Sequence, residues 1–342
     1  MQSLKYKKLL PGRPVGGIGV PFAGFSRIHV LDFSKLLPGP YATQILRDMG
    51  CRVTRIELPY FGDLTRELLP KIEGVGSTYW MVNQKKRFLS FDFRKPAGFK
   101  RLQKLIQSAD VLVEGFRPGL MERIGLGFLD VQRLNKGLVY CSISGYNPKG
   151  PWGRKAGHDL NFLAVSGFLG LGNSDGRIAF PSVQVADLSG SMAAVSGILA
   201  ALLERNKTGR GRHVRIALAD TMHSWLAVAL GYYRAAGQDP SLEAHWWSGG
   251  HPFYRLYDAK DGKKIAVAAV EKAFAFSLLD ALGLAGLKDL AQNPLGNSQE
   301  LSRELERAFK TKTSAQWERI FKDKDCCVTG VCSLKEAANF LA

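Results

Sequence analysis

The sequence predicts an α/β protein in which a large domain with a parallel sheet precedes a smaller α+β domain. Short apolar runs alternate with helical segments over residues 25–215, a pattern typical of a parallel sheet covered by helices. After Gly237 the pattern changes to two apolar strands joined by a turn signal, followed by helices. A length of 342 residues also suits about two domains.

Five apolar strands and the helices between them define the predicted large domain. The first strand ends before Leu37-Pro38-Gly39-Pro40, and the helix that follows ends at Gly50. In the second strand, Val53, Ile56 and Leu58 show the alternation of a partly buried strand. The predicted strands span residues 28–33, 52–58, 88–93, 111–114 and 138–144, and the helices span residues 41–49, 96–108 and 189–205.

The remaining elements predict the small domain. A helix over residues 221–236 leads into it, and two strands then flank Asp261-Gly262, a dipeptide typical of β-hairpin turns. These strands span residues 253–258 and 264–270, and the helices after them span residues 273–282, 298–309 and 314–321. We therefore predict a large domain over 25–215, a helical linker over 216–245 and a small α+β domain over 246–342.

The net charge of +17 is the most unusual property of the composition. Such a charge suits nucleic acid, an anionic membrane surface or a polyanionic small ligand. The densest basic run, over residues 205–215, has no interleaved aromatic rings for base stacking, and we predict that it forms a solvated hairpin. We therefore expect no nucleic-acid partner, and the charge fits a phosphate-bearing ligand.

Apolar runs and the N-terminal residues indicate where the protein resides. No uninterrupted apolar run reaches the roughly 18 residues that span a bilayer, because Ser196 and Gly197 interrupt the longest one. Pro11, Gly12 and Arg13 stand where a signal peptide needs its apolar segment. We expect a cytoplasmic protein with no membrane partner.

Five cysteines are an odd number for a disulfide framework. Cys51 and Cys141 stand in apolar runs, as buried free thiols do. Cys326, Cys327 and Cys332 cluster, but no second pair of ligands lies nearby to complete a zinc site. We therefore predict a reducing compartment and no bound metal.

The motifs of four enzyme classes are missing from the sequence. It has no Walker loop, no G-x-S-x-G, no H-E-x-x-H and no G-x-G-x-x-G after a strand. It therefore gives no support to an NTPase, a serine hydrolase, a zinc protease or a dinucleotide-dependent oxidoreductase.

Two titratable residues at predicted helix starts are candidates for catalysis. His158 follows Gly157 and precedes a helical stretch, which would expose its imidazole among backbone N–H groups. Asp187 opens the long helix, whose N-terminus favours the charged carboxylate. The alternative is an ordinary helix cap, formed by Asp159 beside His158 or by Asp187 itself. We interpret the other histidines as structural or loop residues: His29, His213, His223, His245 and His251.

Both sites belong to a longer series of motifs. Gly157-His-Asp-Leu-Asn-Phe162 is followed by Ala186-Asp187 and then by Thr208-Gly-Arg-Gly-Arg-His-Val-Arg215. Further segments of the series are Leu37-Pro-Gly-Pro40, Asn83-Gln-Lys-Lys-Arg87, Glu114-Gly-Phe-Arg-Pro-Gly119, Arg123-Ile-Gly-Leu-Gly127, Ser142-Ile-Ser-Gly-Tyr146 and Ala269-Val-Glu271. In order and spacing the series resembles the class III CoA-transferase family from about Val30 to about Glu336, and within it the α-methylacyl-CoA racemases.

The resemblance implies a Rossmann-like large domain and an interlocked homodimer. Its active sites would form between the large domain of one subunit and the small domain of the other. By position, His158 and Asp187 would transfer protons, supported by Glu271 and Asp159 respectively. Coenzyme A is part of the substrate, so no separate cofactor is implied. The implied CoA contacts are Arg55, Phe91, Asp92, Phe93, Arg94, Gly115, Phe116, Arg117, Arg123, Gly157, Leu160, Asn161 and Phe162.

The chemistry of the implied reaction explains these residue types. Inverting the carbon next to a thioester requires one base on each face and donors that stabilise the enolate. We therefore expect a racemase acting on a 2-methylacyl-CoA thioester. The alternative within the family is a CoA-transferase in which Asp187 attacks the thioester. Transferases that resemble this family generally lack a histidine at the position of His158, which favours the racemase.

The chain ends at Ala342, whereas the proteins it resembles continue and return to the large domain. We expect the dimer to persist, with an apolar patch exposed on the large domain and with more mobile small domains. Such a patch would favour aggregation at high concentration.

Overall fold

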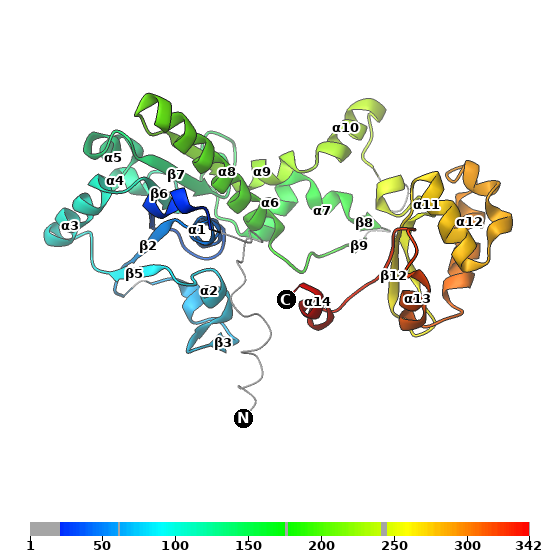
Figure 1. Cartoon of the computed structure of the whole chain (residues 1–342). Coiled ribbons are helices and arrows are strands. Elements are labelled where there is room, and N and C mark those ends of the chain that lie inside the picture. The colour runs from blue at the N-terminus through cyan, green and yellow to red at the C-terminus, as the bar shows by residue number, and fades with distance from the viewer. Residues whose placement is uncertain (1–20, 61, 175–176, 241–244, 342) are drawn as a thin grey trace. The chain divides into compact units, whose positions relative to one another are not determined.

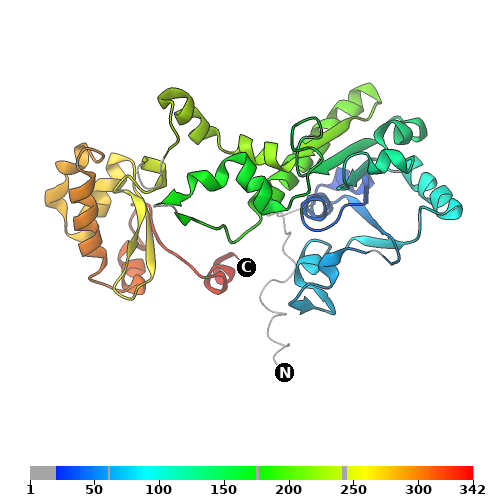
Figure 2. The same cartoon turned by 180° about the vertical axis from the view of Figure 1, so that it is seen from behind.

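The computed structural model describes residues 21–60, 62–174, 177–240 and 245–341, and these form two compact units (Figures 1 and 2). The large unit takes the described residues of 21–169 and 180–227. The small unit takes those of 170–179 and 228–341.

Six parallel strands form the sheet of the large unit, which confirms the predicted α/β class. Their spatial order is β10-β7-β6-β1-β2-β5, so the direction of strand addition reverses between β1 and β6. In open α/β sheets, ligands bind at such a reversal, beyond the carboxyl ends of the strands. The strands are β1 (His29–Asp32), β2 (Arg52–Glu57), β5 (Arg87–Ser90), β6 (Val111–Glu114), β7 (Val139–Ser144) and β10 (His213–Ala217).

Helices pack on this sheet. Proline stands at the first turn of both α1 (Pro38–Asp48) and α3 (Pro96–Gln107), where its missing N–H is not needed. A core cluster that includes Leu31, Leu112 and Tyr140 joins the sheet to α3 and its neighbours. The other elements of this unit are η2 (Ala23–Arg27), η3 (Leu64–Arg66), β3 (Lys71–Ile72), β4 (Val75–Gly76), α2 (Ser77–Met81), α4 (Leu120–Arg123), α5 (Phe128–Leu134), α6 (Asp159–Ser166), α8 (Val185–Thr208) and α9 (Leu218–Ser224).

The long helix α8 packs on α1, α9, β7 and β10. Two glycines permit this close approach, because a Cβ on Gly190 would lie 2.1 Å from a Leu218 methyl and one on Gly197 2.7 Å from a Val214 methyl. Among the described helices, α8 alone is long and apolar enough to cross a membrane, and half of that stretch is buried in the structure. A buried core helix has the same length and composition, so this feature does not by itself indicate a membrane span.

Three predicted elements differ in the structure. The basic run over residues 205–215 is no hairpin. α8 ends at Thr208, is capped by Gly209, whose φ of 68° suits glycine, and β10 then joins the sheet parallel to β7. The strand expected over residues 88–93 ends at Ser90, because the Asp92 side chain accepts the Arg94 N–H at 3.0 Å and turns the chain. The helix expected over 221–236 is two helices, α9 and α10 (Ala227–Ala236).

The small unit is built on an antiparallel sheet with the order β11-β12-β13. The predicted hairpin forms β11 (Tyr254–Asp258) and β12 (Lys264–Ala268), and the sequence did not indicate β13 (Val328–Gly330). In its core Trp317 stacks on Phe321 and meets Phe309 edge to face. The remaining elements are α7 (Phe168–Leu171) at the boundary, β8 (Asn173–Ser174), β9 (Arg177–Ile178), η4 (Trp246–Ser248), α11 (Lys272–Leu282), η5 (Ala285–Leu287), η6 (Leu290–Gln292), α12 (Ser298–Phe309), α13 (Ser314–Phe321) and α14 (Leu334–Leu341).

Candidate active site

The starts of helices α6 and α8 meet at Asp159 and Asp187. Asp159 is the first residue of α6, and its Oδ1 accepts the backbone N–H of Asp187 at 3.0 Å. Asp187 lies in the first turn of α8. His158, the residue before Asp159, occupies the N-cap of α6. The structure therefore brings the turn that carries His158 to the helix start that carries Asp187.

A glycine and a buried ring hold the turn before α6. A Cβ on Gly157 would lie 2.7 Å from Tyr146 Oη and 2.8 Å from the Phe162 ring. Phe162 is buried and meets Tyr146 edge to face, with ring centroids 5.1 Å apart. The His158 N–H donates to Asn161 Oδ1 at 3.1 Å. The His158 side chain is exposed within the large unit. The fold thus fixes the backbone of this turn while leaving the imidazole at the surface of the unit.

The Asp187 side chain is partly buried, and this changes the protonation of its carboxyl. Burial, and then the negative charge of Asp159, raise the pKa of Asp187 to about 7. Burial also raises the pKa of Asp159, although hydrogen bonds from the Asp187 and Ala186 N–H groups oppose that shift. Burial and the charge of Asp159 therefore outweigh the preference for the charged carboxylate expected from the helix N-terminus. A carboxyl with a pKa near neutrality can both accept and donate a proton at physiological pH.

A cavity of about 560 Å³ lies at the carboxyl ends of β6, β7 and β10. Its lining includes Phe116 and Arg117, two of the predicted CoA contacts. Lys149 and Arg215 line it as well. The sequence reasoning missed these two cations. The basic run over 205–215 contains Arg215 and could have pointed to a cation at the cavity. It does so only when β10 is known to lie beside β7.

Three polar side chains at the wall of this cavity are linked. Burial raises the pKa of Glu114 to about 7, opposed by hydrogen bonds from Ser142 and from the Phe116 N–H at 2.9 Å. Ser142 Oγ lies 2.9 Å from His213 Nε2. Burial and then Arg215 lower the pKa of His213 to about 4, so its imidazole is neutral at pH 7. The His213 ring also stacks on Phe128 with centroids 4.9 Å apart, consistent with a structural role.

The other predicted CoA contacts lie in the segments that follow β5 and β6 and in the first turn of α6. Phe93 is buried against Phe33, with ring centroids 5.7 Å apart. The Arg101 guanidinium lies over the Phe91 ring, 4.7 Å from its centroid. The remaining contacts are exposed or partly exposed: Asp92 and Arg94, which form an ion pair at 2.9 Å, and Gly115, Arg123, Leu160 and Asn161.

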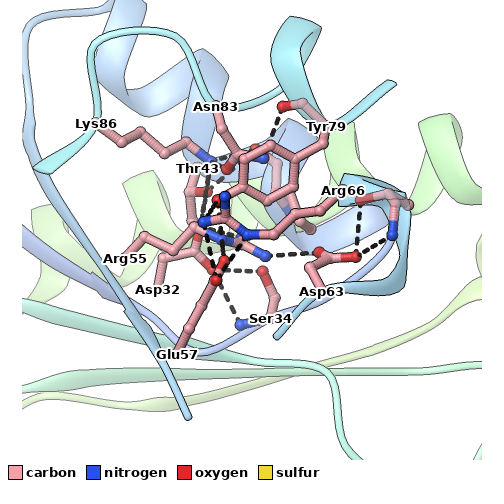
Figure 3. Close-up of polar contacts among 12 residues, drawn as sticks. Asp32, Ser34, Thr43, Arg55, Glu57, Asp63, Arg66, Tyr79, Asn83 and Lys86 are labelled. Atoms are coloured by element: carbon pink, nitrogen blue, oxygen red, sulfur yellow. Dashed lines mark hydrogen bonds and ion pairs between the residues drawn. The ribbon is translucent and has the colours of Figure 1, made fainter. Parts of the chain in front are cut away.

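Arg55 lies elsewhere than predicted (Figure 3). Its side chain is 0% exposed, and its guanidinium forms ion pairs with Asp32 at 3.3 Å, Glu57 at 2.6 Å and Asp63 at 2.6 Å. A contact with CoA would require this enclosed group to leave three carboxylates. We therefore assign Arg55 to the scaffold beneath the site rather than to the CoA surface.

Lys86 completes the same buried network (Figure 3). Its ammonium lies 3.1 Å from Asp32 Oδ2, 2.8 Å from the Pro40 carbonyl and 2.8 Å from Thr43 Oγ1. Burial lowers the pKa of Lys86 to about 8, and the charge of Asp32 opposes that shift. The network ties β1 and β2 to the first turns of α1, next to the point where strand order reverses.

Comparison with known proteins identifies the family. Residues 25–340 match the sequence profile of CoA-transferase family III. The chain belongs to this family. It is 33% identical over 321 residues to "Alpha-methylacyl-CoA racemase" of Homo sapiens, covering 91% of this chain and 78% of that protein. It is 32% identical over 305 residues to "Succinyl-CoA:glutarate CoA-transferase" of Homo sapiens, covering 86% and 68% respectively.

A solved structure shows the same fold. The crystal structure of a CAIB/BAIF family protein from Brucella suis superposes with a TM-score of 0.77 at 27% identity, covering 92% of this chain and 85% of that one. The relatives of this family III chain include both racemases and CoA-transferases. Membership therefore establishes an enzyme of the CoA-transferase and racemase superfamily.

The remaining predicted residue, Glu271, lies in the small unit of this family III chain. It is exposed and directly precedes α11. Within the described residues, no three His, Cys, Asp or Glu side chains form a group that could hold a metal ion. All five cysteines are free: Cys51, Cys141 and Cys326 are buried, and Cys327 and Cys332 are exposed.

Proposed function

We propose that the protein is an acyl-CoA racemase that inverts the α-carbon of a 2-methylacyl-CoA thioester through an enolate. One observation carries the proposal: Asp187, with its pKa raised to about 7, is held by Asp159, the neighbour of His158. Inversion requires two proton-transfer groups that act near neutral pH. The meeting of these two helix starts supplies a carboxyl and an imidazole for that purpose.

In the proposed reaction, Asp187 and His158 each transfer one proton. One removes the α-proton from one face of the substrate, and the other returns a proton to the opposite face. Which group acts first depends on the enantiomer. Backbone N–H groups at helix N-termini stabilise the negative charge that develops on the thioester oxygen.

Cations of the large unit suit the phosphates of CoA. Arg117, Lys149 and Arg215 line the cavity at the carboxyl edge of the sheet, and Arg94, which follows β5, and Arg123, at the end of α4, are exposed. Guanidinium groups bind phosphate oxygens in a bidentate manner. Binding such a polyanionic ligand would give the net positive charge of the protein a role without a nucleic-acid or membrane partner.

The proposal includes the assembly. Glu271 orients His158 from the small domain of the partner subunit in an interlocked homodimer, so each site needs two chains. Coenzyme A enters only as part of the substrate, and no separate cofactor or metal takes part. We place the enzyme in the cytoplasm, where its five free thiols remain reduced.

Incubation with one enantiomer of a 2-methylacyl-CoA in heavy water tests the reaction. We expect deuterium at the α-carbon and progressive loss of optical purity, with no second acid added. Mass spectrometry measures the label and chiral chromatography the inversion. Movement of CoA to an added carboxylate without α-deuterium would replace the proposal with the transferase alternative, in which Asp187 is the nucleophile.

A second prediction concerns the pH dependence of kcat/KM for α-proton exchange. Asp187 must be ionised to act as a base, so the rate with the enantiomer that it deprotonates should fall as the pH drops through about 7. Asp159→Asn removes the neighbouring negative charge, which lowers the pKa of Asp187 and moves this acid limb to lower pH. Asp130→Asn, which removes a surface partner of Arg133, is the matched control and should leave the limb in place. If the acid limb of the pH profile stays in place in Asp159→Asn, the assignment of that limb to Asp187 is contradicted.

A further inference from the structure

The loop between β1 and α1 holds one residue in an unusual backbone conformation. Leu36 has a φ of 64°, in the left-handed region that leucine rarely adopts. Such a conformation costs conformational energy and persists only where the surrounding structure holds it. The loop also lies at the carboxyl end of β1, where the strand order of the sheet reverses.

Two buried carboxylates, Asp63 and Asp32, hold this loop, and Figure 3 shows both beside Arg55. Asp63 Oδ2 accepts the Leu36 N–H at 2.9 Å, and Asp32 Oδ1 accepts the Ser34 N–H at 3.0 Å. The Arg55 guanidinium pairs with both carboxylates, at 2.6 Å and 3.3 Å respectively. The side chains of Asp32, Arg55 and Asp63 are all 0% exposed. One enclosed guanidinium therefore fixes the two acceptors that shape the loop.

The same loop is connected to the turn that carries Asp187. Ser191, in the first turns of α8, has its Oγ 2.7 Å from the Pro38 carbonyl and 2.7 Å from the Asp187 carbonyl. Pro38 is the first residue of α1 and lies two residues after Leu36. The starts of α1 and α8 therefore share one hydroxyl group, and a displaced loop would disturb the contact at Asp187.

We propose that Asp63 is a positioning residue, which holds Leu36 in the left-handed conformation and thereby sets the position of Asp187 for proton transfer. This inference rests on the proposed function. Asp63 is too deeply enclosed to touch a substrate, so it acts through Leu36, Pro38 and Ser191. Its carboxylate also accepts the Thr65 N–H at 3.0 Å, which anchors it to the segment after β2.

Two substitutions at Leu36 test the backbone conformation without touching a buried charge. Leu36→Gly tolerates a positive φ and should keep kcat for α-deuterium exchange close to the wild-type value. Leu36→Val is closer in side chain, but a β-branched residue is a genuine outlier at positive φ. It should lose roughly 10²-fold in kcat, the loss expected when the reacting groups are misplaced by about 1 Å. If only the side chain of Leu36 mattered, Leu36→Val would keep more activity than Leu36→Gly.

Asp63→Asn tests the carboxylate, and Asp110→Asn is its matched control. Asp110 likewise accepts a backbone N–H, from His29 at 2.8 Å, and pairs with an arginine, Arg205, at 2.9 Å. It does so at the amino end of the sheet, because His29 begins β1. We expect Asp63→Asn to lower kcat by at least about tenfold and to move the acid limb of the pH profile. Asp110→Asn should change neither, with rates taken per folded enzyme in both variants.

The outcomes separate this inference from the proposed function. Folded Asp63→Asn with wild-type kcat and pH profile would overturn the inference, as would Leu36→Val that matches Leu36→Gly. If Asp63→Asn fails to fold, the pair at Leu36 decides. If the wild type incorporates no α-deuterium, the proposed racemase fails instead. In that case the variants at Leu36 and Asp63 are compared in CoA transfer to an added carboxylate, a reaction that also requires a precisely positioned Asp187.

Discussion

Asp187→Asn is expected to lose racemisation by up to roughly 10⁴-fold, because inversion cannot proceed when one of the two proton-transfer groups is missing. The amide is similar in size to the carboxyl and keeps the first turn of α8, so the loss should come from chemistry rather than from misfolding. Racemisation is measured as the change in optical rotation of a single 2-methylacyl-CoA enantiomer.

The stability of the same variant provides an independent check. The folded-state pKa of Asp187, at about 7, lies above the value of an unfolded aspartate, so stability falls as the pH rises from the unfolded pKa to the folded one, and the full cost of the buried charge is present at pH 8. Asp187→Asn removes that charge and should leave the free energy of unfolding at pH 8 unchanged or higher. Activity and stability should therefore move in different directions, as is common for buried catalytic groups.

His158→Ala should likewise abolish racemisation. In each of the two variants, however, exchange without inversion could survive weakly from one enantiomer, because a single base still reaches one face of the carbon. The two variants should then retain exchange with opposite enantiomers. Full racemase activity in His158→Ala would contradict the assignment of two bases, and CoA transfer that depends on Asp187 alone would favour the transferase.

Periodic patterns allowed most of the fold to be predicted. The strand Val111–Glu114 and the helices Ser298–Phe309 and Ser314–Phe321 have the bounds that the sequence indicates. The prediction failed for β10, because the glycines and arginines before it are typical of a turn. Only its pairing with β7, which lies some seventy residues earlier in the chain, makes it a strand. β13 was missed for a similar reason, since three residues carry too little periodicity.

The site shows a sharper limit of sequence reasoning. His158 and Asp187 were singled out from their place at helix starts, and the family assignment is confirmed. The raised pKa of Asp187 was missed, because it depends on burial and on Asp159, whose carboxylate reaches the turn only through the fold. Arg55 was assigned to CoA by its position in the family resemblance, and that position does not show whether the side chain is buried. Its partners Asp32 and Asp63 come from separate segments, and no local pattern links them.

Arg55→Met should destabilise the protein by about 3–5 kcal/mol, the cost of removing one partner from a buried ion pair. Methionine can fill much of the volume, but Asp63 is left buried without its guanidinium, and Lys86 becomes the one cation paired with Asp32 among the described residues. Denaturant titration measures the free energy of unfolding. Arg133→Met, which removes an exposed partner of Asp130, is the control and should cost at most about 1 kcal/mol.

The pH dependence of this difference distinguishes lost ion pairing from lost packing. Burial opposes ionisation of Asp32, but Lys86 and then Arg55 outweigh it, so the pKa of Asp32 in the folded protein lies well below its unfolded value. A depressed pKa stabilises the fold above the unfolded pKa, and this contribution is lost as the pH falls through the folded value. Without Arg55, Asp32 becomes easier to protonate, and protonation removes its buried charge. The stability difference between wild type and Arg55→Met should therefore be largest at neutral pH and shrink on acidification, whereas a packing defect would give the same difference at every pH.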